Sequence, residues 1–309
     1  MVPSTDNEPS RVEAPSYVDQ ANAISTNTTP IQSYRGMVLS FREKLLDSYR
    51  KKNSVLCVGL DPALPAQRNS NVVPSRFLDS RDENKSRLSF CLSLVEETSP
   101  YCVAFKPNQQ YVAGFTAEDH RKLTSAMRAA GCVSILDYKL NDIGDSVESA
   151  IFHIKKWGYD AITFNPFLGN IEGTVKLAHS GEQELGIIVL TLTSNPETVR
   201  YQKETRLDGK PLYLAVAEDM QKSGADGCVV GATGHVTTDE IKAIRKAAGD
   251  DRIFLVPGVG TQKGDPEKVI ESGGNILINV SRDVDYAESP ERKAKEYTAL
   301  FRSLGAKLT

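Results

Sequence analysis

The side chains best suited to chemistry lie in one short segment, Asp137-Tyr-Lys-Leu-Asn-Asp142. The run Val133-Ser-Ile-Leu136 before it predicts a buried strand that ends at Asp137. Side chains alternate between the two faces of a strand, so Asp137 and Lys139 are predicted to point the same way. Asp142 follows at the start of a predicted helix, and a plain helix N-cap is the alternative role for it.

Lys106 ends another predicted strand, Val103–Phe105, and would add a second lysine to the same place. Two lysines and two carboxylates in a pocket of low dielectric are costly unless their electric field is used. An opposite charge at about 4 Å contributes about 4 kcal/mol at an effective dielectric constant near 20, so Lys139 is expected to stay protonated. The cluster can therefore present a preset positive charge and a proton to a reacting atom.

Eight short apolar runs alternate with eight helical patterns along the chain. Nearly continuous apolar runs are typical of parallel strands that are covered on both faces. Eight units at a steady spacing favour an α/β fold of the (β/α)8 barrel type, and no G-x-G-x-x-G follows the first strand, which argues against a dinucleotide-binding half. The predicted strands are 54–60, 103–105, 133–136, 161–164, 186–192, 227–230, 253–256 and 276–280. The predicted helices are 84–98, 117–130, 144–157, 170–179, 212–223, 238–247, 266–272 and 290–304, after an N-terminal helix that includes Met37 to Leu46.

In such barrels the active site lies at the carboxyl ends of the strands. The residues that end the predicted strands are Asp61, Lys106, Asp137 with Lys139, Asn165, Ser194, the stretch 258–261 and Arg282. Turn formation alone favours small residues at these places, so charged residues after the first, second, third and eighth strands indicate a functional site.

Composition limits the class of protein. The 309 residues contain 40% hydrophobic and 25% charged residues, as in ordinary soluble globular proteins, and the net charge of −3 argues against a nucleic-acid partner. No apolar run approaches the roughly 20 residues that a membrane span needs. The polar segment 1–34 is predicted to be a disordered tail that lacks a signal peptide, and 35–309 the barrel domain.

The five cysteines are Cys57, Cys91, Cys102, Cys132 and Cys228. Their number is odd, their spacing is wide and most lie in apolar runs, which predicts buried, reduced thiols and a reducing compartment. The four histidines, His120, His153, His179 and His235, have no spacing typical of metal ligands, so no metal site is predicted.

The motif D-x-K-x-x-D-I-G at 137–144 resembles the catalytic signature of the orotidine 5′-monophosphate decarboxylase family. The likeness extends, in the same order, to G-L-D-P at 59–62, F-K-P-N at 105–108, P-G-V-G at 257–260 and S-R-D at 281–283. F-K-P-N and the short P-G-V-G-T-Q loop resemble the bacterial, longer-chain branch. The resemblance covers nearly everything except the tail.

The resemblance implies conversion of orotidine 5′-monophosphate to UMP and CO₂, the last step of de novo pyrimidine synthesis, by a cytoplasmic enzyme without metal or cofactor. Lys139 resembles the proton donor, and three further residues would complete the charged tetrad, namely Lys106, Asp137 and Asp142. In the family, the counterpart of Asp142 reaches in from the neighbouring subunit, which implies a homodimer with shared active sites.

Other positions resemble the family's substrate ligands. Asp61 and Ser146 correspond to residues near the ribose hydroxyls, and Ser194 to the residue that reads the amide edge of the pyrimidine. The implied phosphate site consists of Arg282 with Gly260 and Gln262. Two departures, Tyr138 and Asp145, are expected to affect packing more than chemistry.

The proposed chemistry agrees with the residue types. Loss of CO₂ from an sp² carbon leaves a carbanion with no adjacent electron sink, so a fixed cation and a nearby proton are what the reaction needs. Three alternatives remain: a Mg²⁺-dependent sugar-phosphate decarboxylase or aldol-type lyase, a Schiff-base aldolase, and a non-catalytic binding barrel. A Schiff-base lysine needs a lowered pKa, whereas the flanking carboxylates favour the charged form of Lys139.

Overall fold

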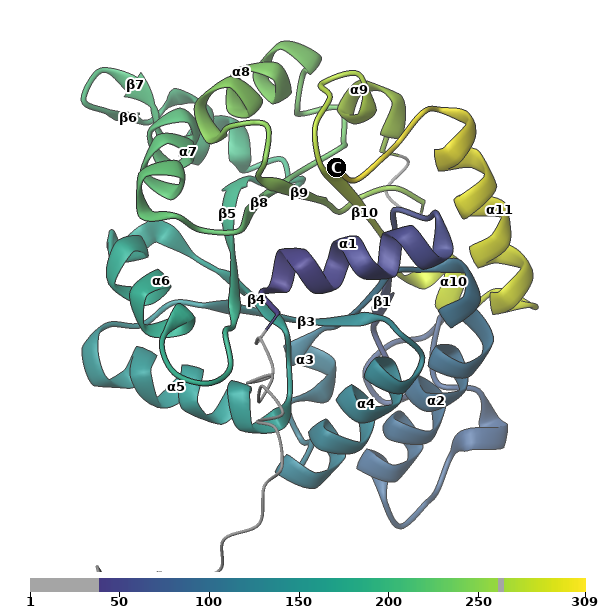
Figure 1. The fold of residues 1–309 in the computed structure, drawn as a ribbon. Coiled ribbons are helices and arrows are strands. Elements are labelled where there is room, and N and C mark those ends of the chain that lie inside the picture. Colours follow the sequence, from purple (N-terminus) through teal and green to yellow (C-terminus); the bar gives the residue numbers. More distant parts are fainter. Residues whose placement is uncertain (1–38, 261–263) are drawn as a thin grey trace, which may run out of the picture. The chain divides into compact units, whose positions relative to one another are not determined.

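The computed structural model describes residues 39–260 and 264–309, so the predicted tail 1–34 and Gln262 lie outside the described residues. Eight parallel strands form a closed barrel in the order β1-β10-β9-β8-β5-β4-β3-β2, with helices around it (Figure 1). The barrel strands are β1 Leu56–Leu60, β2 Ala104–Pro107, β3 Val133–Leu140, β4 Ala161–Phe164, β5 Gly186–Leu192, β8 Gly227–Val230, β9 Ile253–Val256 and β10 Ile276–Val280. The predicted (β/α)8 barrel is confirmed.

The helices follow the predicted alternation. They are α1 Phe41–Lys52, α2 Glu83–Thr98, α3 Gln109–Val112, α4 Ala117–Ala129, α5 Gly144–Trp157, α6 Ile171–His179, α7 Leu212–Ser223, α8 Thr238–Ala248, α9 Pro266–Ile270, α10 Arg282–Asp285 and α11 Pro290–Ser303. Smaller elements that the periodicity did not predict are the short helices α3 and α10, the hairpin β6 Arg206–Leu207 and β7 Lys210–Pro211, the 3₁₀ turns Ser75–Phe77, Ser99–Tyr101 and Pro166–Leu168, and the π-helical turn η4 Val199–Glu204.

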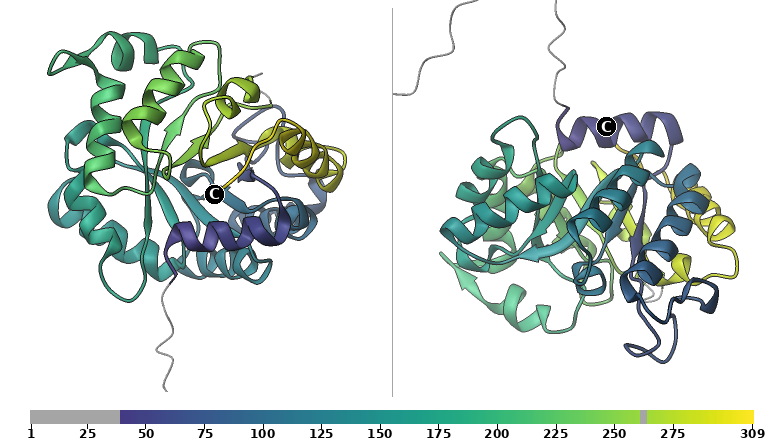
Figure 2. Two further views of the ribbon diagram at one scale, coloured as in Figure 1. Left: turned by 45° about the horizontal axis from the view of Figure 1, so that its top comes forward. Right: turned by 90° about the horizontal axis from the view of Figure 1, so that it is seen from below.

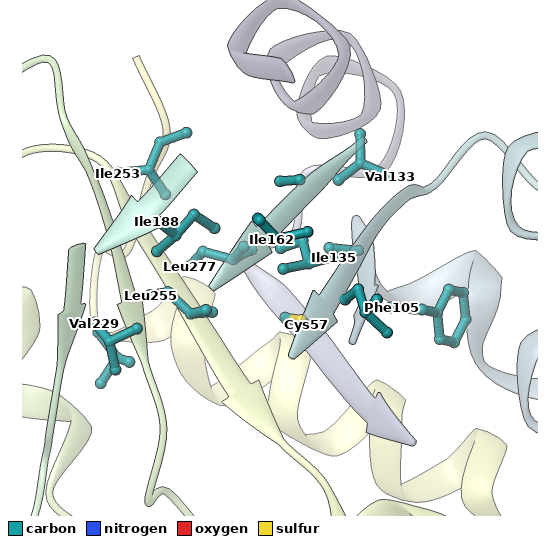
Figure 3. Packing of buried hydrophobic residues seen from close by; sticks show 14 of the residues in the cluster. Cys57, Phe105, Val133, Ile135, Ile162, Ile188, Val229, Ile253, Leu255 and Leu277 are labelled. Carbon is teal, nitrogen blue, oxygen red and sulfur yellow. The ribbon is translucent and has the colours of Figure 1, made fainter. Parts of the chain in front are cut away.

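The register of the barrel decides which side chains face its interior. Paired residues of neighbouring strands share a face, and so do residues two apart in one strand. Because Cys57 pairs with Ala104 and Gly59 pairs with Lys106, all four residues face the barrel interior, where Lys106 lines the cavity. The same alternation, followed around the barrel, places small and branched apolar residues in the lower layers. Figure 3 shows part of this buried cluster, which includes Cys57, Ile135, Ile188, Val229, Leu255 and Leu277.

Helix α1 lies across the amino-terminal end of the strands (Figures 1 and 2). Phe41 packs against the first residue of β5, where a Cβ on Gly186 would lie 2.7 Å from its ring. Lys44 Nζ binds Asp160 Oδ1 at 2.8 Å, and Ser48 Oγ donates to the carbonyl of Val103 at 3.2 Å. The helix therefore closes this end of the barrel, and access is from the carboxyl ends of the strands.

The structure corrects two details near the site. Strand β3 continues to Leu140 instead of ending at Leu136, and its register with β4 shifts between these residues. Helix α2 begins at Glu83, one residue before the predicted start, because Asp82 caps it with a carboxylate that accepts from Lys85 N.

The five cysteines are all buried and free, as predicted. Among the residues that the structure describes, no helix is both long and apolar enough to cross a membrane.

Candidate active site

A cavity of about 1010 Å³ opens at the carboxyl ends of the strands. Inward-facing residues of six neighbouring strands line its floor: Lys106, Asp137, Thr163, Leu190, Val229 and Leu255. The cavity continues past the loop after β5 to residues of α6 and α7. Polar groups from β2, β3 and β4 therefore meet on one side of a largely apolar space, as in small-molecule sites.

Asp137 is the centre of the polar side. Its Oδ2 receives Lys106 Nζ at 2.7 Å, and its Oδ1 receives Lys139 Nζ at 2.6 Å. The Thr163 hydroxyl donates to the same Oδ1 at 3.0 Å. The side chain of Lys106 is 6% exposed, whereas that of Lys139 is 49% exposed and extends into the cavity. The predicted meeting of Asp137, Lys139 and Lys106 is confirmed.

Burial alone would raise the pKa of the Asp137 carboxyl, but the charges and hydrogen bonds of Lys106 and Lys139 outweigh it and lower the pKa well below its usual range. Burial likewise opposes the charged form of Lys106, while Asp137 and then Asp61 favour it, and the pKa of Lys106 is raised. The Lys106–Asp137 pair is therefore ionised before any substrate arrives. Its field requires no reorganisation during a reaction.

The backbone at Lys139 explains how its amine reaches Asp137. Lys139 has a φ of 53°, in the left-handed region, at the shift in register between β3 and β4. Such a conformation costs a non-glycine residue about 1–2 kcal/mol. Lys139 N donates to Thr163 Oγ1 at 2.9 Å, so the threonine hydroxyl stabilises both the unusual backbone and the Asp137 carboxylate.

The substitution Thr163→Val should lower the free energy of unfolding by about 1–3 kcal/mol and reduce kcat, because it leaves Lys139 N without its acceptor. Thr163→Ser keeps the hydroxyl and is the matched control, for which we expect a kcat close to that of the wild type. Urea denaturation and steady-state kinetics measure the two effects. Equal kcat values for the valine and serine variants would show that the hydroxyl does not position Lys139.

Asp61 lies just after β1, next to Lys106. Its backbone is tightly held: the carbonyl accepts from Tyr286 Oη at 2.7 Å and from Arg68 at 3.3 Å. Its Oδ1 is buried and has no hydrogen-bond partner among the described residues. The position of this carboxylate is thus fixed largely through its main chain.

Asp142 and Ser146 lie at the rim and are exposed. Helix α5 has Ile143 as its N-cap, and Asp142 Oδ1 accepts from the Ile143 amide at 2.9 Å, so the alternative that Asp142 caps the helix is wrong. No ion pair joins Asp142 to Lys139 within the described part of the chain. Three apolar side chains on the neighbouring loops are also exposed, namely Ile143 at 61%, Phe167 at 81% and Leu168 at 44%.

Ser194 lines the cavity after β5, and its carbonyl accepts from the Thr233 hydroxyl at 2.8 Å. The π-helical turn η4 brings Gln202 back to this loop, where its Oε1 accepts from Thr193 N at 2.9 Å. A Cβ on Gly231 would lie 2.8 Å from Ser194 Cα, so the loops after β5 and β8 are in close contact. Asn165, also at the cavity, has a local role: its Oδ1 accepts from Phe167 N.

The predicted phosphate residues lie after β9 and β10. Arg282 is half-buried at the first position of α10. Gly260 has a φ of 94°, and a Cβ there would lie 3.1 Å from the Tyr297 hydroxyl, so glycine suits both the backbone and the space. Gln262, the third predicted member, lies outside the described residues.

Sequence reasoning missed two residues of this region, Thr163 and Asp285. Thr163 could have been found from the sequence, since it is a polar residue in an apolar strand and lies two positions before the cavity residue Asn165, on the same face. Asp285 could not have been found in this way, because its contact with Asp61 exists only once the barrel closes. The described residues include no cluster of three or more His, Cys, Asp or Glu side chains that could hold a metal ion.

The class of protein follows from these observations: a (β/α)8-barrel enzyme whose reactive groups are amines and carboxylates at the ends of its strands. The model of the Orotidine 5′-phosphate decarboxylase / HUMPS family matches residues 54–297, and the chain belongs to this family.

Individual relatives agree with this membership. An orotidine 5′-phosphate decarboxylase of Bordetella avium is 34% identical over 267 residues, which cover 82% of this chain and 92% of that protein. A relative of the same name from Cupriavidus metallidurans is 36% identical over 262 residues, 81% of this chain and 90% of that protein. The structure of Leishmania donovani OMP decarboxylase superposes with a TM-score of 0.68 at 28% identity, covering 86% of this chain and 98% of that one.

Proposed function

We propose that the chain decarboxylates orotidine 5′-monophosphate to UMP and CO₂, with Lys139 as the proton donor. The observation that carries the proposal is the Lys106–Asp137–Lys139 cluster at the cavity floor, with its two contacts of 2.7 and 2.6 Å. The bond between the pyrimidine ring carbon and the carboxylate breaks, its electron pair stays on the ring carbon, and the ammonium proton of Lys139 is transferred to that carbon.

The geometry supports direct loss of CO₂. A negative charge that develops on the ring carbon lies near an ammonium group that is already oriented, and this is the arrangement that stabilises a transition state most effectively. Asp137 holds the amine in place through their contact of 2.6 Å. Thr163 fixes the backbone from which the amine extends.

The remaining groups suit a nucleotide. Asp61 would accept from the ribose hydroxyls, and Ser194 would bind the amide edge of the base. Arg282, with Gly260 and Gln262, would bind the phosphate far from the reacting carbon, so that this binding energy can be realised in the transition state.

The active site is proposed to be completed by a second subunit. Asp142 and Ser146 are exposed, Asp142 forms no ion pair with Lys139 of its own chain among the described residues, and the exposed apolar residues beside them suit a twofold interface. We place this homodimer in the cytoplasm, since five free, buried cysteines suit a reducing compartment.

Turnover should be unaffected by EDTA. Both oxygens of Asp137 are already occupied by lysine amines or by Thr163, so Mg²⁺ would have to displace ion pairs to bind there. The measurement is the rate before and after dialysis against EDTA. An EDTA-sensitive rate that Mg²⁺ restores would instead favour a sugar-phosphate lyase.

The direct test of the proposed function is optical. Purified protein added to orotidine 5′-monophosphate should remove the near-ultraviolet absorbance of the orotate ring and produce UMP, as chromatography would confirm. Unchanged absorbance with a folded protein would contradict the assignment.

A further inference from the structure

Asp61 has a buried acidic neighbour, Asp285, that has no role in the mechanism described so far. Helix α10 follows β10, and β10 pairs with β1, so closure of the barrel brings Asp285 to Asp61. Asp61 N donates to Asp285 Oδ2 at 3.3 Å. Asp285 is only 2% exposed, so its carboxyl is inside the protein and not at the cavity surface.

One oxygen of each carboxyl lacks a donor. Asp285 Oδ1 and Asp61 Oδ1 are both buried, and neither has a hydrogen-bond partner within the described residues. A buried carboxylate oxygen without a donor is costly, because it has lost its hydration and gained nothing in exchange.

The hydrogen bonds of the neighbouring cations and of Tyr286 go to groups other than these two carboxyls, and Arg68 Nε has no partner among the described residues. Lys106 Nζ, from β2, binds Asp137 at 2.7 Å. The Arg68 guanidinium donates to backbone carbonyls and to Tyr286 Oη, and Tyr286 Oη donates to the carbonyl of Asp61. A further titratable group that faces the pair is the buried thiol of Cys91 on α2, whose pKa is raised by burial and by both carboxylates.

The charges around Asp285 also favour a neutral carboxyl there. The ammonium groups of Lys106 and Lys139 balance the carboxylates of Asp137 and Asp61. An ionised Asp285 would add a third carboxylate to this buried region, where Arg68, a further cation nearby, makes its hydrogen bonds to backbone carbonyls and tyrosine hydroxyls. Burial raises the pKa of Asp285 well above its ordinary value, and the negative charge of Asp61 raises it further, against smaller opposing effects of the Asp61 amide, Lys106 and Arg68.

We propose that Asp285 is a positioning residue whose carboxyl is neutral at physiological pH and donates its proton to Asp61. The inference rests on the proposed role of Asp61 as the ligand of the ribose hydroxyls. The shared proton supplies the hydrogen bond that the two carboxyls otherwise lack. It also leaves Asp61 with one oriented acceptor oxygen for the sugar and keeps an extra negative charge away from an anionic substrate.

The pH dependence of folding tests the proton. Because the folded pKa is raised, the contribution of Asp285 to stability is fully present below the unfolded carboxyl pKa of about 4 and is lost as the pH rises toward the folded value. The variant Asp285→Asn has no titrating group at this position. The folding equilibrium constant of the wild type relative to this variant should therefore fall by up to about tenfold per pH unit between about pH 5 and about pH 8.

Asp283→Asn is the matched control on the same helix, since that carboxylate already has a donor in Tyr297 Oη at 2.5 Å. We expect the ratio of the wild-type folding equilibrium constant to that of Asp283→Asn to stay constant over the same pH range. If the same ratio is also independent of pH for Asp285→Asn, the proposal is overturned. If that variant does not fold, infrared spectra of the wild type decide, because a neutral carboxyl has a C=O stretch that an ionised one lacks.

Nucleotide binding tests the positioning role. Asp285→Leu removes the donor, so we expect about tenfold weaker binding of UMP, the effect of one hydrogen bond to a charged group, while dUMP, which lacks the 2′-hydroxyl, changes less. Asp285→Asn should keep the preference for UMP. Equal losses for UMP and dUMP would show that Asp285 acts through packing and would overturn the positioning role.

Asp61→Asn separates this inference from the proposed function. If Asp61→Asn leaves the preference for UMP over dUMP unchanged, the assigned role of Asp61 fails, whatever the stability curves show. If the protein does not decarboxylate orotidine 5′-monophosphate, the stability and infrared experiments still report whether Asp285 is protonated.

Discussion

Lys139→Ala is expected to abolish turnover while leaving nucleotide binding largely intact. The substitution removes the proposed proton donor, which is also the cation proposed to face the reacting carbon. General acid catalysis is worth about 10²–10⁴-fold and one oriented electrostatic group about 10²–10³-fold, so kcat should fall by at least about 10⁴-fold. The absorbance assay measures the rate, and calorimetry measures the binding of UMP, for which Asp61 and Arg282 are the proposed ligands.

The control for this prediction is Lys85→Ala, which removes an exposed amine that pairs with Asp79 on the outside of the barrel. It should have the wild-type kcat. Loss of UMP binding together with activity in Lys139→Ala would indicate that Lys139 holds the site together and does not deliver the proton.

Mixing two inactive variants should restore activity if the site is shared. Lys139→Ala and Asp142→Ala, unfolded together and refolded, form mixed dimers in about half of all pairings when association is random. Each mixed dimer has one intact site and one doubly damaged site. About a quarter of the wild-type activity should therefore return.

A second mixture provides the control. Asp137 and Lys139 are in direct contact in one chain, at 2.6 Å, so Asp137→Asn with Lys139→Ala can never produce an intact site. This mixture should stay inactive. If the Asp142→Ala mixture also stays inactive although chromatography shows mixed dimers, Asp142 acts within its own chain.

The site residues that the sequence identified are those whose position depends on local pattern. A parallel strand covered on both faces reads as an apolar run, and the first polar residue after it marks the open end of the barrel. This reasoning placed Asp61, Lys106, Asp137 and Ser194 correctly at the carboxyl ends of their strands. It also gave the bounds of β4, β5, β8, β9 and β10 as the structure has them.

Side-chain alternation along β3 accounts for only part of the contact between Asp137 and Lys139. Simple alternation predicted that the two side chains share a face, but β3 changes register at this point and Lys139 takes a left-handed conformation. That conformation is stabilised by Thr163 of the next strand, which no local pattern of β3 could reveal.

By itself the sequence determined the fold class, the buried thiols and the chemical types of the catalytic groups, because each of these follows from residue type and short-range periodicity. Only the tertiary structure decided that Asp285 lies against Asp61 and that α1 closes the far end of the barrel. These contacts join residues more than a hundred positions apart, such as Lys44 with Asp160 and Asp61 with Asp285. They exist because eight strands close in one register, which is a property of the whole barrel and not of any segment.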